Sequence, residues 1–85
     1  MSIEIDFKKA VEDVKALAKR PSDSDLLLLY ALFKQSENGD CEGSRPGIFD
    51  IVGRKKFDAW KALSGTSRDQ AMEKYISLVT QLKAK

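Results

Sequence analysis

The chain has 85 residues, of which 42% are hydrophobic and 33% are charged, and this balance excludes intrinsic disorder. A chain of this length builds one hydrophobic core, so we expect a single domain over residues 1–85. The net charge of +2 is too small for the broad basic surface of a duplex-binding domain, so we expect no nucleic-acid partner.

The first predicted helix covers residues 3–18. Its apolar residues recur at three- and four-residue spacing, which is typical of an amphipathic helix. They are Phe7, Ala10, Val11, Val14, Leu17 and Ala18. Pro21 closes the helix. The segment from Met1 to Asp6 carries two acids where a signal peptide needs a basic region, so we expect a soluble, cytoplasmic protein.

The second predicted helix covers residues 23–38, with Ser22 as its N-cap and Asn38-Gly39 as its stop signal. It contains the longest apolar run of the chain, residues 26–33. This run is much shorter than the roughly 20 residues that cross a bilayer. We therefore expect no stable insertion into a membrane.

The apolar run of the second helix is hydrophobic on all sides and presents two arcs to its surroundings. The first arc consists of Leu28, Leu29 and Leu32, and the second of Tyr30, Phe33 and Lys34. Two interpretations fit this pattern. The helix is either buried on both sides in the centre of a bundle, or it lines an apolar tunnel whose mouth is polar.

Residues 39–49 form the one long loop, because they are rich in Gly, Asp and Ser and lack a hydrophobic period. Asp50 can cap a third helix that reaches Leu63. Ser67 and Gln70 have the spacing of a capping box at the start of a fourth helix. Since no segment alternates as a strand does, we expect an all-α four-helix bundle with one long loop between the second and third helices.

The chain lacks the residues that most catalytic and metal sites require. It contains no histidine, and Cys41 is its only cysteine. The usual nucleophilic triads, the commonest zinc ligand sets and an intrachain disulfide are therefore excluded. We expect a protein that is not an enzyme and that holds no metal and no cofactor.

A basic cluster, Arg54-Lys55-Lys56, stands at the start of the third helix beside Phe57 and Trp60. It is either a solvated helix face or a site for phosphate, in a nucleic acid or in a small phosphorylated ligand. Cations near a helix N-terminus oppose the helix dipole, which favours a functional reason for them.

Three segments resemble the signature of the acyl-CoA-binding protein family, and the resemblance covers nearly the whole chain. The segments are Lys19-Arg20-Pro21-Ser22-Asp23 leading to Tyr30-Ala31-Leu32-Phe33-Lys34-Gln35, then Gly39-Asp40 with Arg45-Pro46-Gly47, then Lys56-Phe57-Asp58-Ala59-Trp60. The resemblance continues through Gly65-Thr66-Ser67 and Ala71-Met72 to Tyr75-Ile76. It implies an up-down-down-up helix bundle that binds one long-chain fatty acyl-CoA.

The resemblance also implies a set of ligand-binding residues. They are Lys15, Tyr30, Ala31, Leu32, Phe33, Lys34, Val52, Lys56 and Tyr75. In the family, the positions of Tyr30 and Lys34 contact the nucleotide, and the lysine is directed at the 3′-phosphate. The position of Lys56 is a further head-group contact, that of Tyr75 lies against the ligand, and that of Lys15 faces the site.

The chain departs from the family pattern at three positions. Phe33 stands where tyrosine is usual, Val52 where lysine is common, and Phe57 where tryptophan is usual. The first two changes remove a hydroxyl and a cation from the head-group site. The resemblance implies a monomeric carrier and pool former in lipid metabolism. The alternative is a helical adaptor that binds a protein or a nucleic acid through its basic patch.

Overall fold

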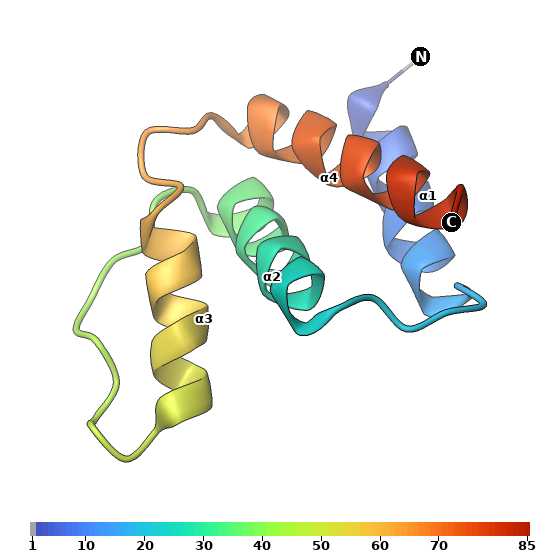
Figure 1. The fold of residues 1–85 in the computed structure, drawn as a ribbon. Coiled ribbons are helices and arrows are strands. Elements are labelled where there is room, and N and C mark those ends of the chain that lie inside the picture. The colour runs from blue at the N-terminus through green and yellow to red at the C-terminus, as the bar shows by residue number, and fades with distance from the viewer. Residues whose placement is uncertain (1) are drawn as a thin grey trace.

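The computed structural model describes residues 2–85, which form four α-helices and no strand (Figure 1). The helices are α1 (Ile3–Lys15), α2 (Asp23–Asn38), α3 (Ile51–Lys61) and α4 (Arg68–Lys83). The predicted all-α, up-down-down-up bundle with a long loop between α2 and α3 is confirmed. Met1, the first residue of the expected domain and of the N-terminal segment, lies outside the described residues.

The helix ends follow the capping signals in the sequence. Ser22 Oγ accepts a hydrogen bond from the backbone N–H of Asp25 at 3.1 Å at the start of α2. Ser67 and Gln70 form the complete reciprocal capping box of α4. Gly39 ends α2 with a φ of 80°, a backbone conformation that residues other than glycine rarely adopt. These predictions from the sequence are confirmed.

Two helices are shorter than predicted. α1 ends at Lys15 and not at Ala18, because the next two N–H groups bond carbonyls three residues back and so tighten and close the last turn. α3 ends at Lys61 and not at Leu63, because the N–H groups of Leu63 and Ser64 bond the carbonyls of Trp60 and Lys61, three residues back. In both cases the hydrophobic period predicted a helix that was too long, because Leu17 and Leu63 are half-buried although they lie outside a helix.

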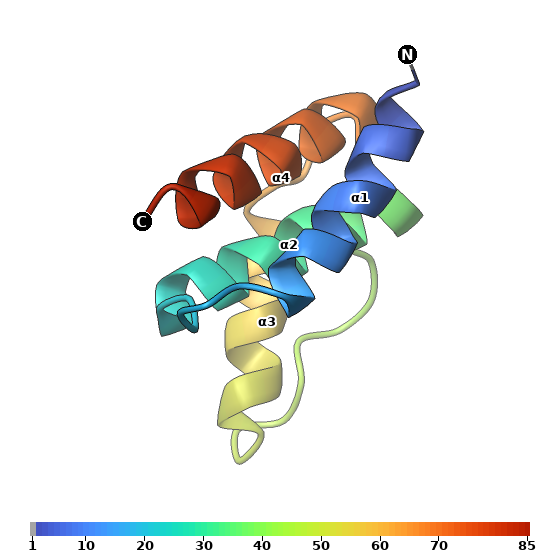
Figure 2. The same cartoon turned by 90° about the vertical axis from the view of Figure 1, so that its right-hand side faces the viewer.

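α2 lies in the middle of the bundle, packed against α4 on one side and α3 on the other, while α1 packs against α4 (Figures 1 and 2). The core comes from α1, α2 and α4. Its buried members are Phe7, Ala10, Leu29, Leu32, Ala71, Tyr75 and Val79. α3 contributes no fully buried residue. It is therefore the helix whose packing is least complete.

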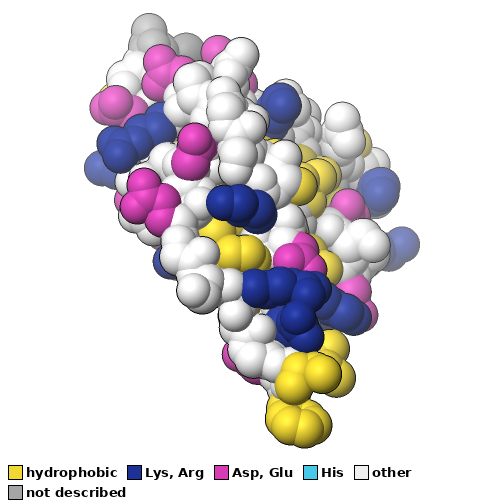
Figure 3. Space-filling model, turned by 90° about the vertical axis from the view of Figure 1, so that its left-hand side faces the viewer, with side chains coloured by type: hydrophobic (Ala, Val, Ile, Leu, Met, Phe, Trp, Pro, Cys, Tyr) yellow, Lys and Arg dark blue, Asp and Glu magenta, His cyan; other side chains and the backbone are white. Residues whose placement is uncertain are grey.

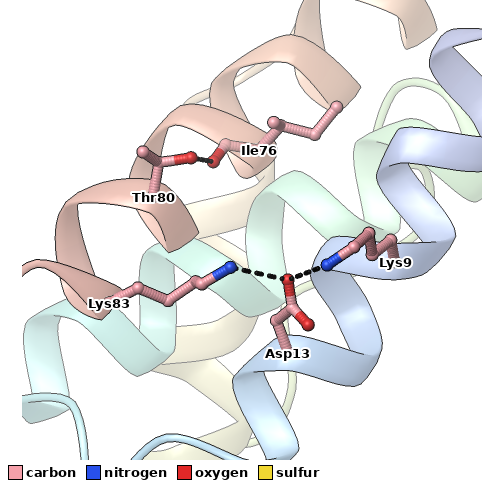
Figure 4. Close-up of polar contacts among 5 residues, drawn as sticks. All are labelled: Lys9, Asp13, Ile76, Thr80 and Lys83. Atoms are coloured by element: carbon pink, nitrogen blue, oxygen red, sulfur yellow. Dashed lines mark hydrogen bonds and ion pairs between the residues drawn. The ribbon is translucent and has the colours of Figure 1, made fainter.

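An ion cluster joins α1 to α4 at the far side from α3 (Figure 4). Asp13 Oδ2 accepts hydrogen bonds from Lys9 Nζ at 3.3 Å and from Lys83 Nζ at 3.1 Å. The bond from Lys83, followed by that from Lys9, lowers the pKa of Asp13 despite partial desolvation. The pair with Lys83 ties the end of the chain to α1.

A buried polar node holds the end of α2, the long loop and the end of α3 together. The amide of Gln35, which is fully buried, donates to Asp40 Oδ1 and to the carbonyl of Thr66, both at 2.8 Å. The indole N–H of Trp60 donates to Gln35 Oε1 at 3.1 Å and to the carbonyl of Gly39 at 2.9 Å. Because α3 contributes no fully buried residue, we infer that these bonds are important in fixing its position.

Candidate functional site

A cleft of about 390 Å³ lies between α2 and α3, within the range of small-molecule sites. Its lining residues are Arg20, Asp23, Leu26, Leu27, Tyr30, Val52, Lys55 and Lys56. Leu26, Leu27 and Val52 give it an apolar wall, and three of the other residues are cations. The cleft therefore matches a ligand that is apolar along its length and anionic at one end.

Tyr30 is the centre of a cationic cluster at this cleft. The ammonium of Lys56 lies 5.1 Å from the centroid of the Tyr30 ring, and the ammonium of Lys34 lies 5.9 Å from it. Lys34 also lies 5.8 Å from the ring of Trp60. Cation–π attraction holds two ammonium groups against one small aromatic surface.

No carboxylate neutralises this cluster. Among the ion pairs of residues 2–85, none includes Lys34, Lys55 or Lys56. Asp23, the one acid of the cleft lining, is paired with Arg20 at 3.3 Å. The ammonium groups of Lys34 and Lys56 lie against aromatic faces, which leaves their N–H donors available to phosphate oxygens.

Trp60 connects the buried polar node to the cationic cluster. Its indole N–H is fixed by Gln35 and Gly39, so its ring is held in place beside Lys34. Both Gln35 and Trp60 belong to the segments that carried the family resemblance, but neither was among the predicted ligand-binding residues. The structure indicates that they position Lys34.

The long loop is tied to α3 by one bidentate ion pair. Arg45 Nε donates to Asp58 Oδ1 at 3.0 Å, and Arg45 Nη2 donates to Asp58 Oδ2 at 2.6 Å. These bonds lower the pKa of the Asp58 carboxyl and raise that of the Arg45 guanidinium. A fork-to-fork pair fixes direction as well as distance. The pair therefore ties the loop to the second half of α3.

The predicted site residues divide into three groups. Tyr30, Lys34 and Lys56 come together in the cationic cluster, and Val52 lies in the wall of the cleft. Lys15 lies elsewhere, exposed at the end of α1 with its ammonium 3.5 Å from Glu12. A ligand contact for Lys15 stays a prediction.

The other predicted residues lie in or against the core. Ala31 and Leu32 are 0% and 2% exposed. Phe33 stacks on the ring of Phe7 with centroids 6.0 Å apart, and Tyr75 meets the same ring edge-on at 5.1 Å. Burial raises the pKa of the Tyr75 phenol. Ligand contacts for these four residues stay predictions, and their structural contacts are with the core.

The cleft also contains residues outside the predicted ligand-binding set, although Lys55 belongs to the basic cluster that the sequence offered as a phosphate site. These are Arg20, Asp23, Leu26, Leu27 and Lys55. The all-round hydrophobicity of α2 was the signal for the two leucines. Leu29 and Leu32 belong to the core, Leu27 lines the cleft, and Leu26 lines the cleft and also packs against the core. The structure thus shows an open cleft along one side of α2.

A second groove, of about 540 Å³, lies between α2 and α4. Its lining residues are Leu28, Leu32, Leu63, Glu73, Lys74, Ser77, Leu78 and Gln81. Although it is larger, its one lysine stands beside a glutamate and it contains no aromatic ring. It offers no cationic cluster for phosphate, so the cleft between α2 and α3 is the better candidate.

The described residues 2–85 contain neither a candidate metal site nor a candidate membrane-spanning helix. No group of three His, Cys, Asp or Glu side chains is placed to hold a metal ion there. The helices of the same residues are all too short or too polar to cross a membrane. Cys41 is buried, 3% exposed, and has no disulfide partner.

Known proteins resemble the chain in sequence over most of its length. A family model described as acyl-CoA binding protein matches residues 4–79. An acyl-CoA-binding protein of Brassica napus is 49% identical over 82 residues, which cover 96% of this chain and 89% of that protein. An acyl-CoA-binding protein homolog of Drosophila melanogaster is 47% identical over 79 residues, covering 93% of this chain and 92% of that protein.

Solved structures resemble the chain in fold as well. The crystal structure of acyl-CoA-binding protein 2 of Oryza sativa matches with a TM-score of 0.90 at 43% identity, covering 95% of this chain and 90% of that one. The crystal structure of a Moniliophthora perniciosa relative matches with a TM-score of 0.88 at 41% identity, covering 96% and 80% of the two chains.

Proposed function

Because the chain belongs to the acyl-CoA-binding protein family, we propose that it binds one long-chain fatty acyl-CoA in the cleft between α2 and α3. The head group would lie against Tyr30, Lys34 and Lys56, and the acyl chain along the wall that contains Val52. We further propose a non-catalytic, monomeric, cytoplasmic carrier that buffers the acyl-CoA pool.

The observation that carries this proposal is the uncompensated pair of ammonium groups on the Tyr30 ring, next to an apolar cleft. The 3′-phosphate of CoA is a dianion that needs charge-assisted donors. The adenine base needs an aromatic or cationic surface on which to stack. One cluster offers both kinds of contact within the width of a nucleotide.

The free energy divides unequally between the two ends of the ligand. Each buried methylene contributes ~0.8 kcal/mol, so a long chain supplies most of the affinity. Charge-assisted phosphate contacts add roughly 1.5–3 kcal/mol each. After the cost of association, this supports sub-micromolar binding. The head group then supplies selectivity over free fatty acids.

Isothermal titration calorimetry tests the proposal with three ligands: palmitoyl-CoA, free CoA and palmitate. We expect one-to-one, sub-micromolar binding of palmitoyl-CoA and much weaker binding of either half alone. Native mass spectrometry of the complex checks the stoichiometry, and an unchanged thioester on incubation checks the absence of catalysis. Absence of binding heat with every acyl-CoA, from medium to very long chains, would overturn the proposal.

A steep salt dependence would favour the alternative, an adaptor for nucleic acid. Phosphate-driven binding of a nucleic acid weakens strongly as salt rises. A ligand held mainly by apolar burial keeps most of its affinity. Titrations of palmitoyl-CoA and of a duplex oligonucleotide, each at low and high salt, therefore distinguish the two functions.

A further inference from the structure

The turn that leads into α3 exposes an unusual group of large apolar side chains. We call Ile48, Phe49 and Ile51 the apolar tip. Phe49 is 96% exposed, Ile48 is 70% exposed and Ile51 is 63% exposed. Figure 3 shows these hydrophobic side chains gathered at the lower end of the molecule, with Lys and Arg side chains directly above them. Adjoining apolar side chains at a protruding end indicate an interaction surface.

The apolar tip is held in a fixed shape by its own backbone. The N–H of Asp50 donates to the carbonyl of Gly47 at 2.9 Å, which closes the turn. The Asp50 carboxylate then accepts from the N–H of Gly53 at 2.9 Å and caps α3. The backbone of the tip is therefore held in one conformation by hydrogen bonds, and this conformation exposes the apolar side chains.

The charges beside the tip are cationic. Lys55 and Lys56 lie on the first turns of α3, and no ion pair found among residues 2–85 includes either of them. The two acids nearest to these lysines in the sequence already have partners, since Asp58 pairs with Arg45 and Asp50 caps α3. An apolar point rimmed by free lysines complements an anionic lipid surface, in which headgroup charge lies above hydrocarbon.

The tip is continuous with the cleft. Val52, 62% exposed, follows the tip at the start of α3 and lines the cleft between α2 and α3. Lys55 and Lys56 also border both regions. A surface that receives the tip would therefore face the apolar wall of the cleft.

We propose that the apolar tip is a peripheral docking surface for anionic membranes. Ile48, Phe49 and Ile51 enter the interface below the headgroups, while Lys55 and Lys56 remain at headgroup level. Docking presents the cleft to the bilayer, which is the reservoir of an amphiphilic ligand; this last step rests on the proposed function. It is distinct from stable insertion, because only the turn and the first residue of α3 enter the lipid.

Vesicle co-sedimentation of the ligand-free protein tests the docking surface. The probes are vesicles of phosphatidylcholine alone and of an equimolar mixture of phosphatidylcholine and phosphatidylserine. We expect stronger partitioning into the mixed vesicles, and we expect sodium chloride from about 0.1 to about 1 M to weaken it by shortening the Debye length. Phe49→Ser should lower the partition coefficient roughly tenfold, since a buried Phe contributes a factor of this order.

Ile48→Ser and Ile5→Ser form a matched pair of variants. Ile5 is exposed to nearly the same extent, 67% against 70%, but it lies on α1 between two acids, Glu4 and Asp6. We expect Ile48→Ser to weaken partitioning severalfold and Ile5→Ser to leave it unchanged. Equal effects of the two variants would overturn the proposal, because they would indicate nonspecific adsorption.

Calorimetry with palmitoyl-CoA separates docking from ligand binding. Phe49→Ser should bind this ligand in lipid-free buffer as the wild-type protein does. A parallel loss of affinity would overturn the proposal and indicate that the tip covers the acyl chain. The proposal would also be overturned if the wild-type protein sediments as a dimer and Phe49→Ser as a monomer. The apolar tip would then be covered by a second copy of the chain. If palmitoyl-CoA does not bind but vesicles do, the docking surface stands and the proposed function fails.

Discussion

Replacement of Lys34 by alanine tests the head-group arrangement most directly. Lys34 is half-buried and lies 5.9 Å from the Tyr30 ring and 5.8 Å from the Trp60 ring, so its ammonium is partly shielded from water. A charge-assisted contact with the 3′-phosphate in this setting is worth roughly 1.5–3 kcal/mol. Lys34→Ala should therefore weaken palmitoyl-CoA by about 10- to 150-fold.

The assay is a double-mutant cycle in which the ligand is one partner. Palmitoyl-CoA and palmitoyl-dephospho-CoA, which lacks the 3′-phosphate, are titrated calorimetrically into the wild-type protein and into Lys34→Ala. Loss of the phosphate should weaken the wild-type complex and should have little effect on the variant. Lys74→Ala is the matched control, because Lys74 lines the groove between α2 and α4 and should leave the phosphate dependence intact.

The result that would refute the reasoning is equal sensitivity to the phosphate in the wild-type protein and in Lys34→Ala. Lys34 would then not contact the 3′-phosphate, whatever its effect on overall affinity. Urea unfolding of both proteins accompanies the titrations. Loss of two cation–π contacts should cost no more than about 2 kcal/mol, which leaves the variant folded.

Three further outcomes are expected. Phe33→Tyr should leave the fold intact by circular dichroism and tighten palmitoyl-CoA by at most about tenfold, because one added hydrogen bond contributes ~0.5–1.5 kcal/mol; weaker binding would show that the pocket is arranged differently. Gln35→Leu should lower the free energy of unfolding in urea by about 2–3 kcal/mol, because the buried partners of the amide lose their hydrogen bonds; an unchanged midpoint would contradict the buried node. Acid should lower the melting temperature below about pH 4. Ion-paired or hydrogen-bonded carboxyls such as Asp13 and Asp40 have folded pKa values below their unfolded values. Their stabilisation is therefore present above the unfolded pKa and is lost as the pH falls through the folded pKa. Asp13→Asn should reduce this acid sensitivity in thermal scans, and an unaltered pH profile would argue against its ion pairs.

The sequence by itself determined where the helices begin, because a helix start is a local event. Ser22, Asp50 and Ser67 cap helices that begin at the next residue, as their side chains predicted. The sequence also indicated the family, and through it Tyr30, Lys34 and Lys56. These three lie on α2 and α3, and the structure brings their side chains together, while their role as head-group contacts stays a prediction.

Helix ends and the boundaries of the cleft required the tertiary structure. Leu17 and Leu63 continue the hydrophobic period because they are half-buried, although the helices have already ended. Similarly, the leucines of α2 are alike in sequence, and only the positions of α3 and α4 decide that Leu29 is in the core and Leu27 in the cleft. The hydrophobicity of a side chain predicts that it is removed from water. Which residues it then contacts depends on elements that are distant in the chain. The exposed apolar tip depends on the same fact, because nothing in the order of its residues shows that the rest of the chain leaves Phe49 uncovered.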